Sequence, residues 1–494
     1  MAVTTYSKLQ HAGLEHILLQ PSDGAYAARQ GSYLAQNAAL NPACVLQPRT
    51  AEDVSQVMRA IADTGINFAV RSGGCVLWPG GSSIADGVTI DLGAMGDVIY
   101  NSSTRIASLQ PGSNWGEVYK EMEKHCVMVA GARDVAVGVG GFLTGGGNSY
   151  LTGRIGFACD TVVNFEVVLA DSRIVNANAT EHADLWKALK GGWSNVGIVT
   201  RFDVGTLPGN SIWAGSRVHD YSIIDKAAAA LVKYTEQCHK APQTAHLLVG
   251  GYNPNFPGGR AIVTVVADTE GNEAPQIFDE ILSIPTVFEN LGQTTIRAMA
   301  KQSGYSAETR RRAHWFTLTF ANDIEIVKKA ISLHEKLATD AKAIVGSDNF
   351  VTSMVFQPLP ACFAEIGTRK GGNSMGLAAV KSNSIMWLLT MNFADPSLDE
   401  SIYEACRGCE KDLEAFARSR GGDVPWRYIN YADKSQHPWL SCGPELVDFL
   451  TEVSKKYDPQ QVFQHQQPGS FTLLNARTAN AHPMALTAAT IEGA

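Results

Sequence analysis

The chain has 494 residues, which is too long for a single hydrophobic core and predicts two or three packed units. Hydrophobic residues make up 45% and charged residues 18%, as in an ordinary soluble globular protein, so disorder is excluded as the main state. With 40 basic and 48 acidic residues the formal net charge is −8, which excludes a broad basic surface for nucleic acid.

The amino terminus has no basic segment followed by an apolar run, and no apolar run approaches the roughly 20 residues that span a bilayer. We therefore expect a cytoplasmic protein without a membrane span. The nine cysteines are odd in number and scattered, which favours free thiols over a disulfide framework. The C-x-x-C pair of Cys406 and Cys409 has no second pair and no neighbouring histidine, so we expect no metal site.

Residues 40–110 alternate between strand and helix patterns. A short apolar run near the start is followed by a predicted helix with Thr50 as its N-cap and Gly65 as its stop signal. The segments 67–74 and 87–93 then read as strands. This order predicts a βαβ unit in which the loops at strand ends carry function.

The remaining chain divides into three parts. Residues 127–205 contain a dense glycine segment and then two strands joined by a turn at 170–173. Between about 213 and 424, amphipathic helices alternate with strands, which predicts a second α+β unit. The segment 425–475 returns to the character of the first part, and the tail 476–494 is predicted to be disordered because it is rich in Ala and Thr without periodicity.

Two glycine-rich segments are the candidates for ligand binding. The first joins Arg71-Ser72-Gly73-Gly74-Cys75 to Gly80-Gly81-Ser82-Ser83, and the second joins Gly138-Val139-Gly140-Gly141 to Gly145-Gly146-Gly147. Glycine lets successive backbone amides point into one concavity and bind phosphate oxygens. A single cluster of this kind is as well explained by a turn, but two clusters, each interpreted as a loop directly after a strand, favour a phosphate-bearing ligand. The spacing fits neither a P-loop nor a nicotinamide Rossmann motif.

The glycine segments and several other motifs resemble the fungal branch of the berberine-bridge-enzyme-like FAD-linked oxidoreductases of the vanillyl-alcohol-oxidase superfamily. The motifs follow one another in the same order as in that family. They are RSGG, PGGSS, GVTIDLG, VGVGGFLTGGG, GIVTRF, YINYAD and YDPQQVF. The resemblance covers roughly residues 40–475. It implies an α+β fold in which a bipartite PCMH-type FAD-binding domain carries an inserted α+β substrate domain. The implied parts are an N-terminal segment (1–39), the FAD-binding domain (40–212), the substrate domain (213–424) and a C-terminal return (425–475).

The resemblance also implies roles for individual residues. The two glycine segments would hold the pyrophosphate of FAD, and the strand with Ile198 and Val199 would border the adenine. Tyr428 and Asn430 would lie against the flavin ring, with Tyr428 as the candidate proton-handling group; an aromatic core strand is the alternative interpretation. Gln357 and Asn373 are the candidates for orienting the substrate.

Cys75 departs from the family pattern. The residue after RSGG is usually a histidine that attaches to the flavin 8α-methyl group, and some relatives add a second attachment through a cysteine at the position of Asp134. Three interpretations of Cys75 stay open: an inert small residue, a nucleophile that forms a thioether to the flavin, and an engineered substitution. We expect the first, and therefore FAD held without a covalent bond.

The resemblance implies an FAD-dependent oxidase that acts on a hydrophobic small molecule in fungal secondary metabolism. Substrate would lose a hydride to flavin N5, and dioxygen would reoxidise the flavin. The alternative is a redox-neutral cyclase or isomerase that retains the flavoprotein fold. Loss of both attachment residues favours that alternative, as does Trp193, where relatives more often carry a small residue.

Overall fold

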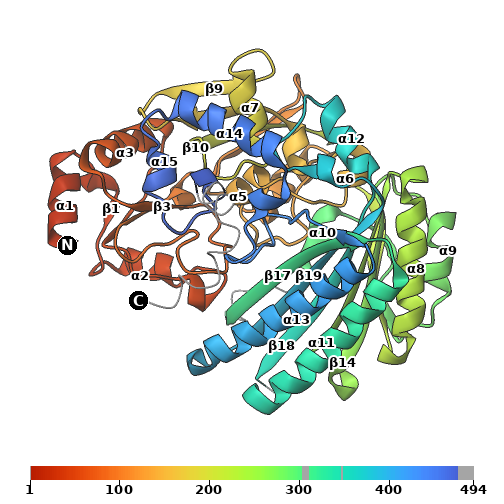
Figure 1. Cartoon of the computed structure of the whole chain (residues 1–494). Coiled ribbons are helices and arrows are strands. Elements are labelled where there is room, and N and C mark those ends of the chain that lie inside the picture. The colour runs from red at the N-terminus through yellow and green to blue at the C-terminus, as the bar shows by residue number, and fades with distance from the viewer. Residues whose placement is uncertain (1, 303–310, 347–348, 475, 477–494) are drawn as a thin grey trace.

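The computed structural model describes residues 2–302, 311–346, 349–474 and 476 (Figure 1). We predicted that the tail 476–494 is disordered, and its residues 477–494 lie outside the described residues. The described chain is a mixture of helix and sheet, as expected, and its strands form a four-stranded, a five-stranded, a two-stranded and a nine-stranded sheet.

The predicted βαβ unit is confirmed in the four-stranded sheet. Its order is β1-β2-β4-β3, and β2 and β3 both run parallel to β4. Helix α3 (Ala51–Thr64) begins at Thr50, whose side chain accepts a hydrogen bond from the Asp53 amide, and ends at the left-handed Gly65. The strands are β1 (Leu18–Leu19), β2 (Cys44–Leu46), β3 (Phe68–Arg71) and β4 (Val88–Asp91).

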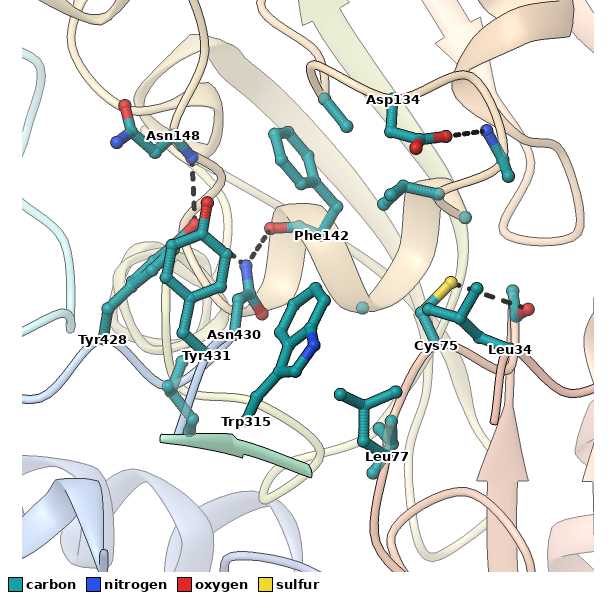
Figure 2. Close-up of a pocket in the computed structure, with 18 of the residues that line it drawn as sticks. Leu34, Cys75, Leu77, Asp134, Phe142, Asn148, Trp315, Tyr428, Asn430 and Tyr431 are labelled. Atoms are coloured by element: carbon teal, nitrogen blue, oxygen red, sulfur yellow. Dashed lines mark hydrogen bonds between the residues drawn. The ribbon is translucent and has the colours of Figure 1, made fainter. Parts of the chain in front are cut away.

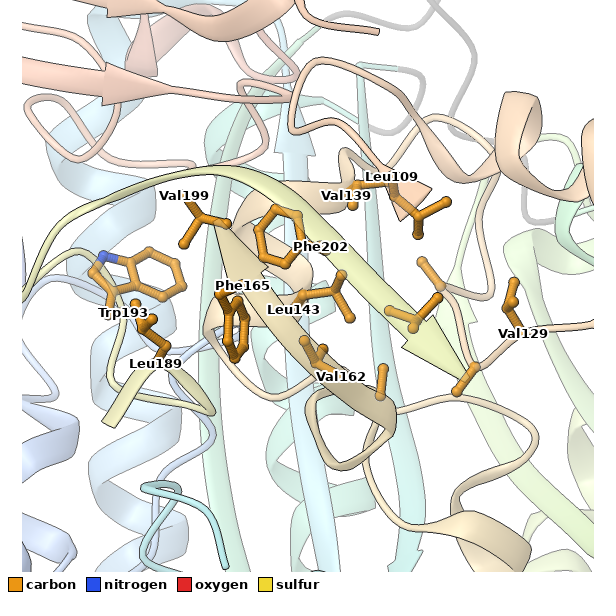
Figure 3. Close-up of a cluster of buried hydrophobic side chains, with 14 of the residues drawn as sticks. Leu109, Val129, Val139, Leu143, Val162, Phe165, Leu189, Trp193, Val199 and Phe202 are labelled. Atoms are coloured by element: carbon orange, nitrogen blue, oxygen red, sulfur yellow. The ribbon is translucent and has the colours of Figure 1, made fainter. Parts of the chain in front are cut away.

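The five-stranded sheet, in the order β5-β6-β10-β8-β9, is antiparallel. Phe165 and Phe202 lie directly opposite each other on β8 and β10 with their rings edge to face, an arrangement that contributes about 0.5–1.5 kcal/mol beyond burial. This pair is at the centre of an apolar cluster (Figure 3). The strands are β5 (Val98–Asn101), β6 (Ile106–Leu109), β8 (Val162–Val168), β9 (Ile174–Asn178) and β10 (Ile198–Gly205).

The C-terminal segment packs back onto these first two sheets. The amide of Phe68 on β3 donates to the Gln466 carbonyl, and the buried Asn195 side chain bonds Gln464 and the Phe471 carbonyl. Helix α14 (Pro444–Tyr457) ends directly before Asp458, and α15 (Val462–His465) follows.

The nine-stranded sheet follows the order β15-β12-β14-β13-β18-β19-β17-β20, with β16 also paired to β12. Helices α8 (Ile224–Gln237), α11 (Ile324–Val345) and α13 (Asp399–Ser419) cover one face (Figure 1). On β13, alternate residues such as Leu248 are fully buried toward these helices, whereas Leu247 and Val249 point to the opposite face. The strands are β12 (Ile212–His219), β13 (Thr244–Tyr252), β14 (Arg260–Asp268), β15 (Phe288–Glu289), β16 (Gly292–Thr294), β17 (Arg312–Ala321), β18 (Phe350–Leu359), β19 (Ser384–Phe393) and β20 (Asp423–Val424).

The second glycine segment differs from its prediction as a loop directly after a strand. Val139–Thr144 forms a short helix, α5, with Gly138 as its N-cap. Val139 and Leu143 are fully buried, and this apolar contact outweighs the low helix propensity of Gly140 and Gly141. The strand before it, β7 (Val127–Met128), ends well before Gly138.

Candidate functional site

A cavity of about 570 Å³ lies where the first glycine segment, helix α5, residues 428–433 and the nine-stranded sheet meet (Figure 2). This volume is within the range of small-molecule and cofactor sites. The cavity is therefore built from segments that are hundreds of residues apart in the chain.

The first glycine segment forms one end of the cavity. Backbone N–H groups of residues 73–77 donate to no carbonyl or side chain among the described residues. The Ser82 hydroxyl, which is buried and also lines the cavity, has no hydrogen-bond partner in the same part of the chain. Adjacent unpaired amides with a hydroxyl donor form a concave anion site, so this end of the cavity fits a phosphate group.

The two glycine segments touch each other through their backbones. A Cβ added to Gly73 would lie 2.6 Å from the Cα of Gly138, and one added to Gly138 would lie 2.5 Å from the Cα of Gly73. Ser72 fixes the contact, since its hydroxyl donates to the Pro111 carbonyl at 2.5 Å and accepts from the Gly140 amide at 3.1 Å. Glycine is required at this contact because no side chain fits between the two backbone segments.

Arg71 and Ser83 lie behind the first glycine segment and do not line the cavity. The Arg71 guanidinium donates to the Arg29 carbonyl at 2.6 Å, faces Asp91 at 3.8 Å and covers the Tyr33 ring. Burial lowers the pKa of Arg71, and the Asp91 carboxylate opposes this effect. The Ser83 hydroxyl bonds the backbone of Leu40. These two residues hold the first glycine segment in place from the side that faces away from the cavity.

Five other residues of the glycine segments also lie outside the cavity lining. Val139 is in the apolar core, and Gly80 is pressed against the backbone of Gly469. The remaining three allow close packing: a Cβ on Gly145 would lie 1.9 Å from the Asn430 side chain, and Gly146 and Gly147 are similarly tight against Met375 and Phe142. The predicted residues that do line the cavity are Ser72, Gly73, Gly74, Cys75, Gly81, Ser82, Gly138, Gly140, Gly141, Ile198, Val199, Gln357, Tyr428 and Asn430.

Trp193 lines the cavity next to the strand that carries Ile198 and Val199. Its φ of 59° is uncommon for a bulky residue, and its amide donates to the Thr144 carbonyl at 3.1 Å. A backbone conformation of this kind carries strain that the surrounding structure must maintain. The indole is thereby held in the wall of the cavity.

Tyr428 and Asn430 come together at the end of helix α5 (Figure 2). The Tyr428 hydroxyl oxygen accepts hydrogen bonds from the amides of Gly147 and Asn148, each at 2.9 Å, and from Asn430 Nδ2 at 3.0 Å. These three donors favour the phenolate, but burial of the ring outweighs them and raises the pKa of Tyr428 above its ordinary value. The phenol therefore keeps its proton at neutral pH.

Tyr431 is a cavity residue that the sequence analysis did not single out. It is half-buried, and its ring meets those of Tyr428 and Trp315 edge to face. Among the described residues its hydroxyl has no hydrogen-bond partner. The second tyrosine of YINYAD could have indicated this residue. The sequence could not show, however, which of the two tyrosine hydroxyls already has hydrogen-bond partners within the protein.

The two predicted substrate residues are separated by the structure. Gln357 on β18 lines the cavity and accepts from Asn148 Nδ2 at 3.3 Å. Asn373 lies outside the cavity lining, where its amide donates to Asp160 Oδ1 at 2.9 Å. Burial raises the pKa of Asp160, and the Asn373 bond opposes this effect.

The sheet supplies the opposite end of the cavity mainly with apolar side chains, among them Leu247, Val249, Val265, Val355 and Leu388, and with fewer polar ones, such as Ser216, Ser353 and Thr390. Arg133 is the only lysine or arginine in the described part of the lining. An apolar wall with few polar groups is typical of a site for a hydrophobic molecule.

Cys75 and Asp134 both line the cavity near the first glycine segment (Figure 2). Burial raises the pKa of the Cys75 thiol, the Gly138 amide beside the sulfur lowers it, and the Asp134 carboxylate raises it further. Arg71 has the smallest effect on this pKa. The thiol is protonated at neutral pH and is a poor nucleophile.

Within the described ranges no helix is long and apolar enough to cross a membrane, and no three His, Cys, Asp or Glu side chains cluster as metal ligands would. Cys406 and Cys409 are free and buried in α13.

Comparison with known proteins identifies the class. The family described as FAD binding domain matches residues 42–178. The FAD-dependent monooxygenase sdcF of Emericella nidulans is 34% identical over 92% of this chain and 95% of its own length. Two solved structures share the fold. Glucooligosaccharide oxidase from Acremonium strictum has a TM-score of 0.74 at 19% identity, over 93% of this chain and 97% of its own. Berberine bridge enzyme has a TM-score of 0.72 at 16% identity, over 94% and 99%.

The fold and the phosphate cradle thus define an FAD-binding protein. The chain belongs to the family of FAD-linked oxidoreductases with a PCMH-type FAD-binding domain that includes the fungal relative.

Proposed function

We propose that this protein is an oxidase that holds FAD without a covalent bond and oxidises a hydrophobic small molecule of fungal secondary metabolism. The observation that carries the proposal is one cavity with an anion cradle of unpaired amides at one end and an apolar sheet wall at the other. The name of the relative, FAD-dependent monooxygenase, supports flavin chemistry with dioxygen.

The residues present fit FAD. The amides of residues 73–77 and the Ser82 hydroxyl would hold its pyrophosphate, and Ile198 and Val199 would border the adenine. When bound, FAD supplies a two-electron acceptor for the substrate.

The side chains around the other end would orient the substrate and handle its proton. Tyr428, which keeps its proton, is held in place by three N–H donors and can only polarise a substrate group as a hydrogen-bond donor. Tyr431 faces the same cavity with a hydroxyl that has no partner among the described residues, so it is the better placed group to contact a substrate hydroxyl or carbonyl. The apolar wall excludes water and strengthens these polar contacts.

The flavin and the overall reaction can be tested with the purified holoprotein. Heat-released cofactor should be FAD, and anaerobic addition of hydrophobic phenols and alcohols should bleach the flavin absorbance with at least one of them. Admission of air should then restore the colour with one hydrogen peroxide per substrate oxidised.

Other outcomes of the same experiment identify other reactions. If isotopically labelled dioxygen is admitted instead of air, the appearance of the label in the product would show that the protein is a monooxygenase. Conversion of substrate without any bleaching would support the redox-neutral cyclase or isomerase, which is favoured by Cys75 and Asp134 at the two attachment positions.

A further inference from the structure

The nine-stranded sheet opens between two of its central strands. Pairing of β13 with β18 begins at Leu248 and Phe356, although β13 starts at Thr244 and β18 continues to Leu359. The two strand ends stay paired to their outer neighbours, β14 and β19. The sheet therefore has a wedge-shaped opening between residues 244–247 and 357–359, which we call the sheet gap.

The sheet gap contains a second chamber of about 40 Å³. On the face toward the cavity it is lined by Asn148, Leu247 and Gln357, which also line the cavity itself. On the helix face it is lined by Tyr234 of α8 and by Cys362 of α12 (Cys362–Arg369). A water molecule needs about 10–15 Å³ of such volume, so the chamber has room for roughly three.

His246 lines the chamber with an unsatisfied nitrogen. Its side chain is 3% exposed, and Nδ1 lies 3.0 Å from the Val265 carbonyl oxygen. Because a carbonyl can only accept, Nδ1 carries the proton and Nε2 is an acceptor. Burial lowers the pKa of His246 to about 4, so the ring is neutral. Nε2 is buried and has no partner among the described residues.

Water is the ligand that fits this position. A buried acceptor without a partner is costly, and internal water normally satisfies such groups. The hydroxyls of Ser149 and Thr152 and the Tyr234 phenol line the same chamber and provide further partners. At its outer end the chamber is lined by His239, which is exposed to solvent.

We propose that the sheet gap holds water anchored on His246 Nε2 and connects the substrate end of the cavity with solvent at His239. Its use rests on the proposed function. When bound and reduced, FAD would supply two electrons and one proton to dioxygen, and a second proton from solvent would complete hydrogen peroxide. An apolar cavity wall hinders entry of that proton, whereas a chain of water through the sheet allows it.

The first test is a crystal structure of the holoprotein in which ordered waters are visible. We expect a water within hydrogen-bond distance of His246 Nε2 and of a second polar group of the chamber. His246→Leu should lose this water and His246→Gln should keep one. A dry chamber in the wild-type protein would overturn the proposal. This test involves no flavin chemistry, so its result is independent of the proposed function.

The second test measures the connection. The dithionite-reduced holoprotein is mixed with dioxygen, and the return of flavin absorbance is followed in a stopped-flow instrument. Cys362→Leu fills the gap and should slow reoxidation several-fold, whereas Cys362→Ser leaves it open and should match the wild type. Both variants must bind FAD with the wild-type spectrum. Equal rates in the two variants would refute the connection.

Discussion

Tyr428 and Tyr431 are three positions apart in the chain, yet their hydroxyl groups have opposite surroundings. The first accepts three N–H donors in the interior, and the second faces the cavity without a partner among the described residues. A hydroxyl that holds three buried donors is chiefly structural, because its loss would leave all three unpaired.

Tyr428→Phe should therefore lower the free energy of unfolding by about 1–3 kcal/mol. Tyr431→Phe is the matched control and should change it by no more than about 0.5 kcal/mol, while reducing substrate oxidation. Urea unfolding of both variants checks the first expectation and flavin bleaching by substrate the second. Equal stability of the two variants would contradict the assigned roles.

Cys75 is the residue on which covalent attachment depends. Since burial and Asp134 raise the pKa of its thiol, we expect the flavin colour in the supernatant after acid precipitation and the mass of the bare chain in the pellet. Colour that stays with the pellet, and disappears in Cys75→Ala, would instead assign a thioether to this residue. Gain of a flavin adduct in Cys75→His would show that position 75 lies against the 8α-methyl group.

At the scale of elements, the contact between the first glycine segment and α5 shapes the phosphate cradle. The backbones of Gly73 and Gly138 are in direct contact, so an added Cβ could not be accommodated by the rotation of a side chain. Gly73→Ala should separate the two segments and greatly reduce bound FAD, measured from the ratio of flavin to protein absorbance. The control is Gly96→Ala, where a Cβ meets nothing within 4 Å. Full FAD content in Gly73→Ala would show that the contact is not required.

Helix α13 carries a buried carboxyl group, Glu410, which accepts a hydrogen bond from Gln436. Burial raises the pKa of Glu410 to about 7 from its ordinary value of 4.5. Because the pKa of Glu410 is higher in the folded than in the unfolded protein, its contribution to the free energy of unfolding is complete below about pH 4.5. This contribution is lost as the pH rises through about 7. Glu410→Gln should remove this loss and be more stable than the wild type at about pH 8. Urea unfolding across this range provides the check; a parallel decline in both proteins would contradict it.

Local elements were predictable because their signals are local. The cap at Thr50, the stop at Gly65 and the turn between β8 and β9 depend on a few neighbouring residues, and all are confirmed. Helix α5 was missed because its glycines disfavour a helix that tertiary packing of Val139 and Leu143 nevertheless stabilises.

At the scale of the whole molecule, the site depends on contacts that no local pattern records. Asn373 and Gln357 looked equivalent in the sequence, but the fold turns one toward Asp160 and the other into the cavity. The sheet gap likewise depends on where two strands part, which their alternating residues do not show. The resemblance predicted the cofactor and the fold, whereas the orientation of each side chain required the structure.

Two buried histidines link the stability of the whole protein to acid pH. Burial lowers the pKa of His246 and of His334 to about 4, from 6.5 for an unperturbed ring. A lowered folded-state pKa means that their contribution is complete above about pH 6.5 and is lost as pH falls through about 4. By about 1.36 kcal/mol per pKa unit, each can contribute at most roughly 3 kcal/mol to this loss.

The double variant His246→Gln/His334→Gln should therefore show a shallower fall in the free energy of unfolding between about pH 6.5 and about pH 4 than the wild type. Each single variant should show about half of the change, because the two rings have no hydrogen bond to each other and should act independently. Urea unfolding at several pH values in this interval measures the slope directly. Replacement of His239 by Gln is the control and should leave the slope unchanged, since the His239 side chain is exposed to solvent rather than buried. An unaltered slope in the double variant would assign acid unfolding to other groups, with the buried carboxyls as the first to examine.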